Sequence, residues 1–170
     1  MPSSVGLWSA AHAEELIDGL VVADAAFHLA DACPLGSAAS YGVPLPLDRE
    51  MTSDLLGFAR VQNNVLYANN SRGRVEGVAL AAVEQVCLTL ARMAEDLILY
   101  AMPEFGWFTL PKELCSGSSI MPQKHNPDGL ELVRAKAAVV GADRESVTSI
   151  TRGLPSGYNR DFQLTKAPFF

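Results

Sequence analysis

The sequence contains few cysteines, and they form no pattern that is typical of a metal site. Cys33, Cys87 and Cys115 are odd in number and far apart, and no CxxC motif or Cys/His ligand spacing is present. We therefore expect no bound metal, and free thiols in a reducing compartment are the simplest interpretation.

Positive charge is also scarce. Thirteen lysines and arginines stand against 19 acidic residues, which gives a net charge of −6. No basic stripe is available to meet phosphates, so a nucleic-acid partner is not expected, although a local basic pocket for a small anion remains compatible with this charge. The N-terminal residues lack the basic region of a signal peptide, and we expect a cytoplasmic protein.

The sequence has no long hydrophobic run that is free of charge. Residues 75–100 are apolar enough to suggest a membrane span, but five charged residues interrupt them, each costing roughly 2.5–3.5 kcal/mol near a bilayer centre. These residues are Glu76, Glu84, Arg92, Glu95 and Asp96. We therefore predict a buried helix of a bundle and no membrane partner. Because 49% of the residues are hydrophobic and only 19% are charged, we also expect apolar surface that other chains cover.

Sustained strand alternation is missing, whereas helical periodicity is frequent. The patterns predict long helices over about 5–32 and 73–100, and one or two shorter helices within 48–70. In the first helix, Leu16, Leu20 and Phe27 fall near one face, and Ile17 and Val21 widen that apolar face. Few strands and long amphipathic helices indicate an all-α, long-helix bundle.

A third long helix is predicted to begin at Asn126 and to end near Gly153 and Pro155. Asn126 is a good N-cap and Pro127 suits the first helical position. Glycine and proline at the other end are typical stop signals.

The loop of residues 116–127, between the second and third long helices, combines groups that suit an anionic substrate. Gly117 permits close approach beside a pair of hydroxyls, Lys124 supplies a cation, and the following helix start presents backbone N–H groups. From composition alone, an ordinary Gly/Ser-rich loop with a solvated lysine is the alternative interpretation. The functional interpretation favours a carboxylate-bearing ligand.

Within this loop, GSSIMPQKHNP resembles the GSSxMPxKxNP signature of the fumarase/aspartase superfamily and matches it at every fixed position. Gln123, the DGLELVR that begins at Asp128, residues 153–166, and the PLGSAA and PLDRE stretches resemble the argininosuccinate lyase family. The resemblance covers essentially all 170 residues. It implies that 1–170 is a partial central helical-bundle domain including the signature loop 116–127, with N-terminal and C-terminal domains absent.

The resemblance implies a carbon–nitrogen lyase that eliminates fumarate from argininosuccinate and releases arginine. A base removes a proton beside a carboxylate, the carbanion delocalises into that carboxylate, and the C–N bond breaks. The family needs no cofactor and acts as a homotetramer, whose active sites draw residues from three subunits. The resemblance does not decide whether this chain is active alone.

The resemblance also assigns roles within and beside the signature loop. Ser118 is the implied catalytic base, and its neighbour Ser119 is expected to have a hydrogen-bonding or structural role. Lys124 and Asn126 match residues that hold the substrate carboxylates. Glu131 matches the acidic partner of the family's catalytic histidine, although an ordinary first-turn glutamate is the alternative.

Three further residues match substrate-binding positions that contact the succinate and guanidino ends, namely Tyr158, Gln163 and Lys166. Polar surface loop residues are the alternative interpretation. A binding arginine of the family lies in a Ser-x-Arg-Asp pattern from which this sequence departs at residues 71–74, so that Arg72 and Arg74 both remain candidates.

None of the three histidines matches the family's general acid/base histidine, which belongs to a Thr-His signature that precedes the segment resembling residue 1 onward. His12 and His28 are expected on the polar or packed face of the first helix, and His125 is expected to be a solvated loop residue.

Two alternatives to argininosuccinate cleavage stay open. One is another fumarate-releasing lyase of the superfamily, such as an adenylosuccinate lyase-like enzyme, against which Gln123 and the YNRD stretch that begins at Tyr158 argue. The other is a non-catalytic piece of the bundle, for instance a crystallin-like structural relative.

Overall fold

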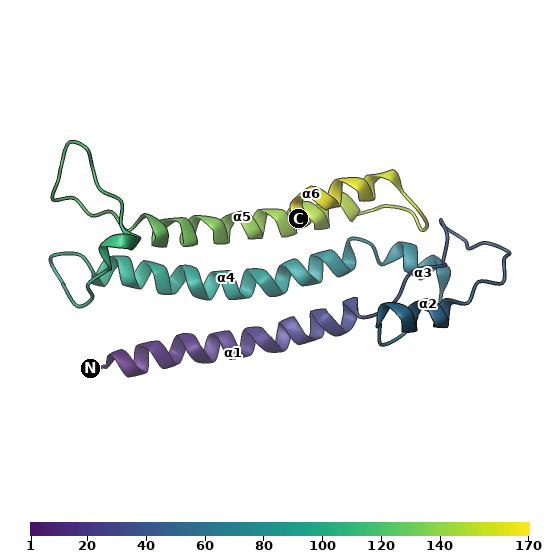
Figure 1. Ribbon diagram of the computed structural model, residues 1–170, viewed down its shortest axis with the longest axis horizontal. Coiled ribbons are helices and arrows are strands. Elements are labelled where there is room, and N and C mark those ends of the chain that lie inside the picture. Colours follow the sequence, from purple (N-terminus) through teal and green to yellow (C-terminus); the bar gives the residue numbers. More distant parts are fainter. The chain divides into compact units, whose positions relative to one another are not determined.

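The computed structural model describes residues 1–170 and is helical, with two isolated bridges and no β-strand. Three long helices dominate it (Figure 1): α1 (Val5–Ala30), α4 (Arg74–Tyr100) and α5 (Asp128–Thr151). The prediction of an all-α chain with long helices is confirmed, and the bounds of α1 and α4 differ from the expected ones by at most two residues.

Five shorter helical elements complete the chain. Two of them lie where short helices were predicted, namely α2 (Arg49–Leu56) and α3 (Val65–Asn70). The other three were not predicted, because each spans only three to six residues and leaves no periodicity to read. They are η1 (Lys112–Leu114), η2 (Arg160–Thr165) and α6 (Lys166–Phe169).

The chain divides into two compact units. Unit 1 contains residues 1–19 and 83–141, and unit 2 contains residues 20–82 and 142–170. Each long helix contributes one part to each unit.

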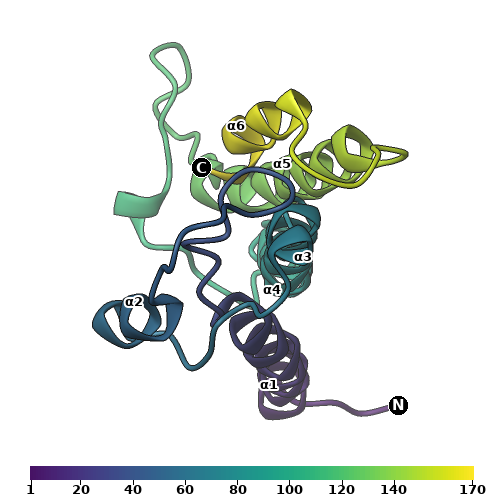
Figure 2. The same ribbon diagram turned by 90° about the vertical axis from the view of Figure 1, so that its right-hand side faces the viewer.

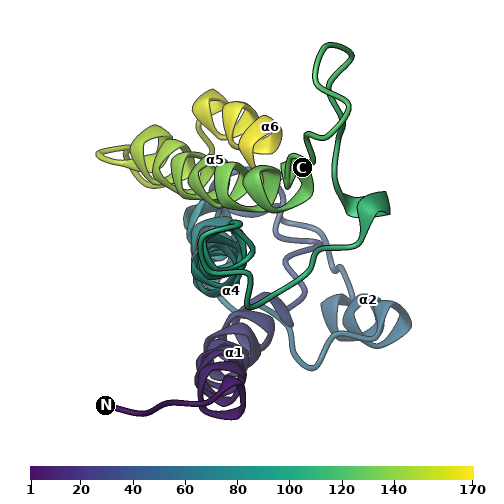
Figure 3. The same ribbon diagram turned by 90° about the vertical axis from the view of Figure 1, so that its left-hand side faces the viewer.

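In unit 1 the C-terminal part of α4 lies between the first turns of α1 and the first turns of α5 (Figure 3). Polar contacts join these helices as well as apolar packing. The indole N–H of Trp8 on α1 donates to Asp96 on α4 at 2.7 Å, and Arg134 on α5 pairs with Glu95 on α4. Two loops extend from this unit, residues 101–111 and the signature loop 116–127.

Unit 2 holds α2, α3 and the long loop that precedes them (Figure 2). Side-chain caps define both short helices: Asp48 accepts from the Met51 N–H, and Asn64 accepts from the N–H groups of Leu66 and Tyr67. The guanidinium of Arg49 donates to three backbone carbonyls at 2.8–3.1 Å and so joins α2 to Leu35 in the loop before it and to residues 62–63 after it. Cys33 and Val61 form a bridge that closes the base of this region.

The apolar face predicted for α1 is largely exposed within this chain, although Leu16 is half-buried. Leu20 and Phe27 are 64% and 63% exposed, whereas the buried positions are His12, Gly19 and Ala26. A Cβ built on Gly19 would lie 3.5 Å from the Val86 Cγ2 atom, so α1 lies close to α4 at this glycine. Periodicity alone cannot distinguish such a small-residue face from the larger apolar face beside it.

The helix α4 is less buried in the single chain than expected. By length and composition it is the one helix of the structure that is long and apolar enough to span a membrane, a test that core helices of other proteins also pass. Leu80, Ala82, Thr89 and Ala94 are buried, while leucines such as Leu88 are about half exposed. The prediction of a buried bundle helix is therefore only partly met within this chain.

Candidate active site

The signature loop 116–127 is closed at its base by a pair of reciprocal hydrogen bonds. The Ser116 N–H donates to the Asn126 carbonyl at 2.9 Å, and the Asn126 N–H donates to the Ser116 carbonyl at 2.8 Å. A turn near the tip is held by the Lys124 N–H, which donates to the Met121 carbonyl at 3.0 Å. These contacts lie within the loop itself, so its shape is set locally.

Inside this loop the Ser118 hydroxyl oxygen accepts two backbone hydrogen bonds. The N–H groups of Ile120 and Met121 donate to Ser118 Oγ at 3.3 and 3.2 Å. Ser118 is half-buried, whereas Ser119 is exposed. Two N–H dipoles that point at one oxygen stabilise negative charge on it, which is the condition a serine needs to act as a base. The two neighbouring serines therefore differ in their backbone contacts, and the catalytic role of Ser118 stays a prediction.

The helix α5 begins two residues later than the predicted cap. The Pro127 carbonyl accepts from the N–H groups of Leu130 and Glu131, so Pro127 and not Asn126 takes the cap position. The Asn126 carbonyl instead accepts from the Ser116 N–H in the bridge. The half-buried Asn126 therefore belongs to the base of the loop, directly before the helix start.

The remaining predicted residues of unit 1 are exposed. Lys124 lies near the tip of the loop, and Glu131 lies in the first turn of α5, where a carboxylate complements the helix dipole. A cavity of about 350 Å³ in the same unit is lined by His125 and Cys115 and by residues of the preceding loop, but not by Ser118, Lys124 or Glu131. Their catalytic roles stay predictions.

The other predicted binding residues lie in unit 2. The Gln163 side-chain amide donates to the Tyr158 hydroxyl at 3.1 Å, so the structure brings these two together. Lys166 is the first residue of α6. All three side chains are exposed and available to a ligand. Since the loop 116–127 belongs to the other unit, the two groups form two separate sets here.

Both candidate arginines line one polar cavity of about 300 Å³ in unit 2. The Arg72 guanidinium carbon lies 5.2 Å from the centre of the Phe162 ring, a cation–π contact that fixes its direction. Between them, Gly73 has a φ of +79°, and an added Cβ would lie 2.1 Å from the Thr151 Cγ2 atom. The backbone at position 73 therefore favours glycine in this chain.

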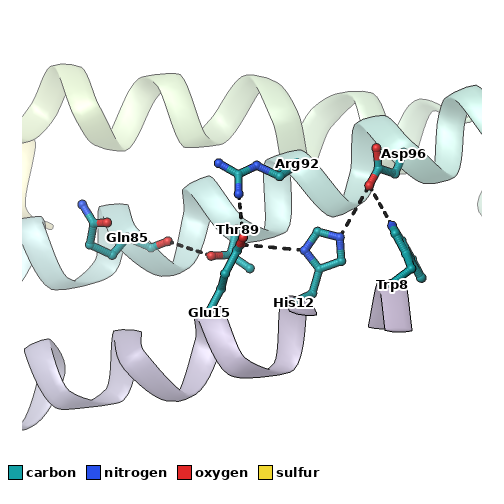
Figure 4. A network of polar contacts seen from close by, with 7 residues as sticks. All are labelled: Trp8, His12, Glu15, Gln85, Thr89, Arg92 and Asp96. Carbon is teal, nitrogen blue, oxygen red and sulfur yellow. Dashed lines mark hydrogen bonds and ion pairs between the residues drawn. The ribbon is translucent and has the colours of Figure 1, made fainter. Parts of the chain in front are cut away.

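The histidines of α1 lie as expected, one packed and one on the polar side. His12 is 6% exposed and points from α1 towards Asp96 on α4, with its Nε2 atom 3.5 Å from the carboxylate (Figure 4). The Trp8 indole donates to the same carboxylate. His28 is exposed and lies 3.5 Å from the Asp24 carboxylate. The network around His12 joins two helices of unit 1.

Sequence reasoning missed the residues that hold the segment of Tyr158. The Gly157 N–H donates to the Asn70 side chain at 2.8 Å, and the Tyr158 N–H donates to the Ser40 hydroxyl at 3.0 Å. Neither Asn70 nor Ser40 carries a sequence signal for this contact, because the partners are 87 and 118 residues apart.

A family model described as "Lyase" matches residues 1–141 of the chain. The chain belongs to this lyase family. It is 51% identical over 168 residues to an argininosuccinate lyase of Sorangium cellulosum, with 99% of this chain and 39% of that protein covered. It is 46% identical over 169 residues to the argininosuccinate lyase of Phocaeicola vulgatus, with 99% of this chain and 38% of that protein covered.

Solved lyase structures share the fold. An EDDS lyase in complex with formate superposes with a TM-score of 0.83 at 28% identity, over 87% of this chain and 30% of that chain. The class II fumarase from Schistosoma mansoni reaches the same TM-score at 17% identity, over 99% of this chain and 40% of that chain, which shows the fold alone. The chain thus spans about two fifths of the length of the curated relatives it matches.

Proposed function

We propose that this chain is the central helical part of an argininosuccinate lyase, which eliminates fumarate from argininosuccinate and releases arginine. The observation that carries the proposal is the signature loop 116–127, set in a chain that is 44–51% identical to argininosuccinate lyases over 99% of its length. The product arginine places the reaction in arginine biosynthesis.

Ser118 is the proposed base of the elimination. Its oxygen takes a proton from the carbon beside a substrate carboxylate, and the electron pair moves into that carboxylate. The pair then returns to form the carbon–carbon double bond of fumarate as the bond from the neighbouring carbon to nitrogen breaks, and the nitrogen takes a proton from the general acid. A serine hydroxyl must first pass its own proton to a general base, and the two N–H groups that donate to Ser118 Oγ support this step by stabilising the charged oxygen.

The developing double charge on the carboxylate is the main barrier to this reaction. Lys124 and Asn126 are proposed to hold the substrate carboxylates, and Ser119 to add a hydrogen bond. The proposed role of Glu131 is to orient the histidine that acts as general acid or base. A fixed cation and fixed donors lower the barrier because they need no reorganisation when the charge appears.

Tyr158, Gln163 and Lys166 are proposed to bind the substrate away from the reacting carbon. The hydrogen bond between Gln163 and the Tyr158 hydroxyl supports a shared role, because it holds both polar ends in one place. No cofactor enters the proposed reaction.

A homotetramer in the cytoplasm is the proposed working form, without nucleic-acid or membrane partners. The exposed apolar residues of α1 support contacts with other chains, since Leu20, Val21 and Phe27 are each more than 60% exposed. Active sites that draw residues from several subunits are part of this proposal.

Turnover of argininosuccinate tests the proposal. The chain is assayed alone and as a chimera, defined as this chain joined to the flanking segments of the Sorangium cellulosum relative. Both are produced in a host that lacks its own argininosuccinate lyase, and fumarate absorbance is followed, with the Ser118→Ala chimera as background. Formation of fumarate and arginine in equal amounts is expected of the chimera.

Fumarate release from a different succinyl-bearing substrate, without turnover of argininosuccinate, would move the chain to another lyase of the superfamily. A folded chimera that releases no fumarate from any of them would favour the non-catalytic alternative.

A further inference from the structure

The backbone of residues 156–158 is fixed by two side chains from distant parts of unit 2. The Gly157 N–H donates to Asn70 Oδ1 at 2.8 Å, and the Asn70 side-chain amide donates to Ser156 Oγ at 3.1 Å. The Tyr158 N–H donates to Ser40 Oγ at 3.0 Å. Two successive N–H groups are thereby held from two sides.

The fit between the two distant parts is close. Gly157 is buried with a φ of +107°, and a Cβ added to it would lie 3.0 Å from Ser40 Oγ. Ser40 itself has a φ of +61°, an uncommon conformation for a residue other than glycine. Such conformations persist where the surroundings determine them, and they gather at functional sites.

The end of α3 connects the two holding groups. The side-chain amide of Asn69, which is 7% exposed, donates to the Ala38 carbonyl at 3.2 Å and to the Ser40 carbonyl at 3.5 Å. Its neighbour Asn70 holds Gly157. One asparagine therefore fixes the loop that carries Ser40, while the next asparagine fixes the segment that Ser40 contacts.

We infer that Asn70 and Ser40 are positioning residues for the substrate contacts of Tyr158 and Gln163. The inference rests on the proposed function, in which these two residues bind the substrate. Because the backbone of Tyr158 is held, the Tyr158 phenol has a defined place. The Gln163 amide, which donates to this phenol, is held in the same place. Asn70 and Ser40 affect the substrate only through the backbone of residues 157–158.

The substitutions Asn70→Leu and Ser40→Gly remove the two contacts in the chimera. Ser40→Gly suits the positive φ, and Asn70 is exposed, so both variants are expected to fold. We expect each to raise the KM for argininosuccinate about tenfold while kcat changes less than about twofold, because binding made equally in ground and transition states is lost. Asn63→Leu, an exposed asparagine of the same unit, is the matched control and should leave both constants unchanged.

Two readouts separate positioning from a merely structural role. Amide hydrogen exchange at Gly157 and Tyr158 should become faster in Asn70→Leu and Ser40→Gly and stay slow in Asn63→Leu. The effect of Tyr158→Phe on KM should be smaller in the Asn70→Leu background than in the unsubstituted chimera, because the phenol is already misplaced. Asn70→Asp keeps the acceptor for the Gly157 N–H and should restore slow exchange there.

An unchanged KM in both Asn70→Leu and Ser40→Gly would overturn the inference, as would additive effects with Tyr158→Phe. If Tyr158→Phe alone has no effect on KM, the segment does not bind the substrate and the inference is wrong, even if amide hydrogen exchange changes as expected. Absence of argininosuccinate turnover in the unsubstituted chimera is a different result, and it counts against the proposed function itself.

Discussion

The signature loop 116–127 and the segment 156–166 are held in opposite ways. The hydrogen bonds that shape the loop run between its own residues, from the Ser116–Asn126 pair at its base to the two N–H groups on Ser118. The backbone of the segment is instead held by Asn70 and Ser40 from elsewhere in unit 2. A locally held loop keeps its geometry when distant residues change, whereas a segment held from afar responds to them.

The difference matches the chemistry that each region is proposed to perform. A base must have its charge stabilised at one oxygen, and the nearest backbone N–H groups can do that. A binding residue must reach a substrate at a fixed place, which requires a rigid frame behind it. Changes in the two regions should therefore affect different kinetic constants.

The largest effect is expected from Ser118→Ala. The substitution removes the oxygen that the Ile120 and Met121 N–H groups contact, and a positioned base contributes on the order of 10²- to 10⁴-fold to rate. We expect kcat of the chimera to fall about a thousandfold, or about 4 kcal/mol, with KM little changed. Steady-state fumarate release measures both constants.

Ser119→Ala is the matched control for that experiment, because the neighbouring serine is exposed and lacks the two backbone donors. It should lose no more than about tenfold in kcat. Equal losses in the two variants would remove the distinction between the serines and the local explanation with it.

The next largest effect is expected from a substitution of Gly157, which can be compared with the same substitution of Gly117 in the signature loop. Gly157→Ala must place a Cβ 3.0 Å from Ser40 Oγ at a φ of +107°, whereas nothing lies within 4 Å of a Cβ on Gly117. We expect Gly157→Ala to lower the free energy of unfolding by about 1–3 kcal/mol and to raise KM. Denaturant unfolding and kinetics measure the two changes.

Gly117→Ala serves as the control, with less than about 1 kcal/mol of destabilisation expected. Adding Ser40→Gly to Gly157→Ala removes the close contact and should recover part of the stability, but not the KM. Full recovery of KM in this double variant would show that the Ser40 hydroxyl does not position Tyr158.

The locally held loop was easier to predict from the sequence than the segment that distant residues hold. The loop of Ser118 could be located from the sequence because residues 117–127 match a family signature, and the role of Ser118 follows from that resemblance; the two backbone N–H groups that donate to Ser118 Oγ were not predicted. Helix existence was also predictable from periodicity. The holding role of Asn70 was not, since it depends on which residues the fold brings beside Gly157. Nor was the buried face of α1, where small residues such as Gly19 pack and Phe27 stays exposed.

A smaller effect is expected from Trp8→Phe. This substitution tests whether the signature loop 116–127 is independent of packing elsewhere in unit 1. The change removes the indole N–H that donates to the Asp96 carboxylate at 2.7 Å and leaves an aromatic ring beside Phe108. A hydrogen bond to a charged group contributes about 1.5–3 kcal/mol, and we expect the loss in unfolding free energy to fall in that range. The kcat of the folded protein should stay within about twofold, and a thousandfold loss would contradict local control of Ser118.

The smallest effect is expected from Arg92→Gln, which affects the same pair of helices through an exposed ion pair. Arg92 on α4 donates to Glu15 on α1 at 2.6 Å, with 66% and 35% of the two side chains exposed (Figure 4). Exposed pairs contribute only about 0.2–1 kcal/mol because solvent screens them and ordering two long side chains costs entropy. Denaturant unfolding should show a change in that range at low salt and a smaller one at high salt. A loss of unfolding free energy as large as that of Trp8→Phe would mean that other subunits cover this ion pair. The helices of unit 1 would then depend on assembly, as the segment of Tyr158 depends on its distant partners.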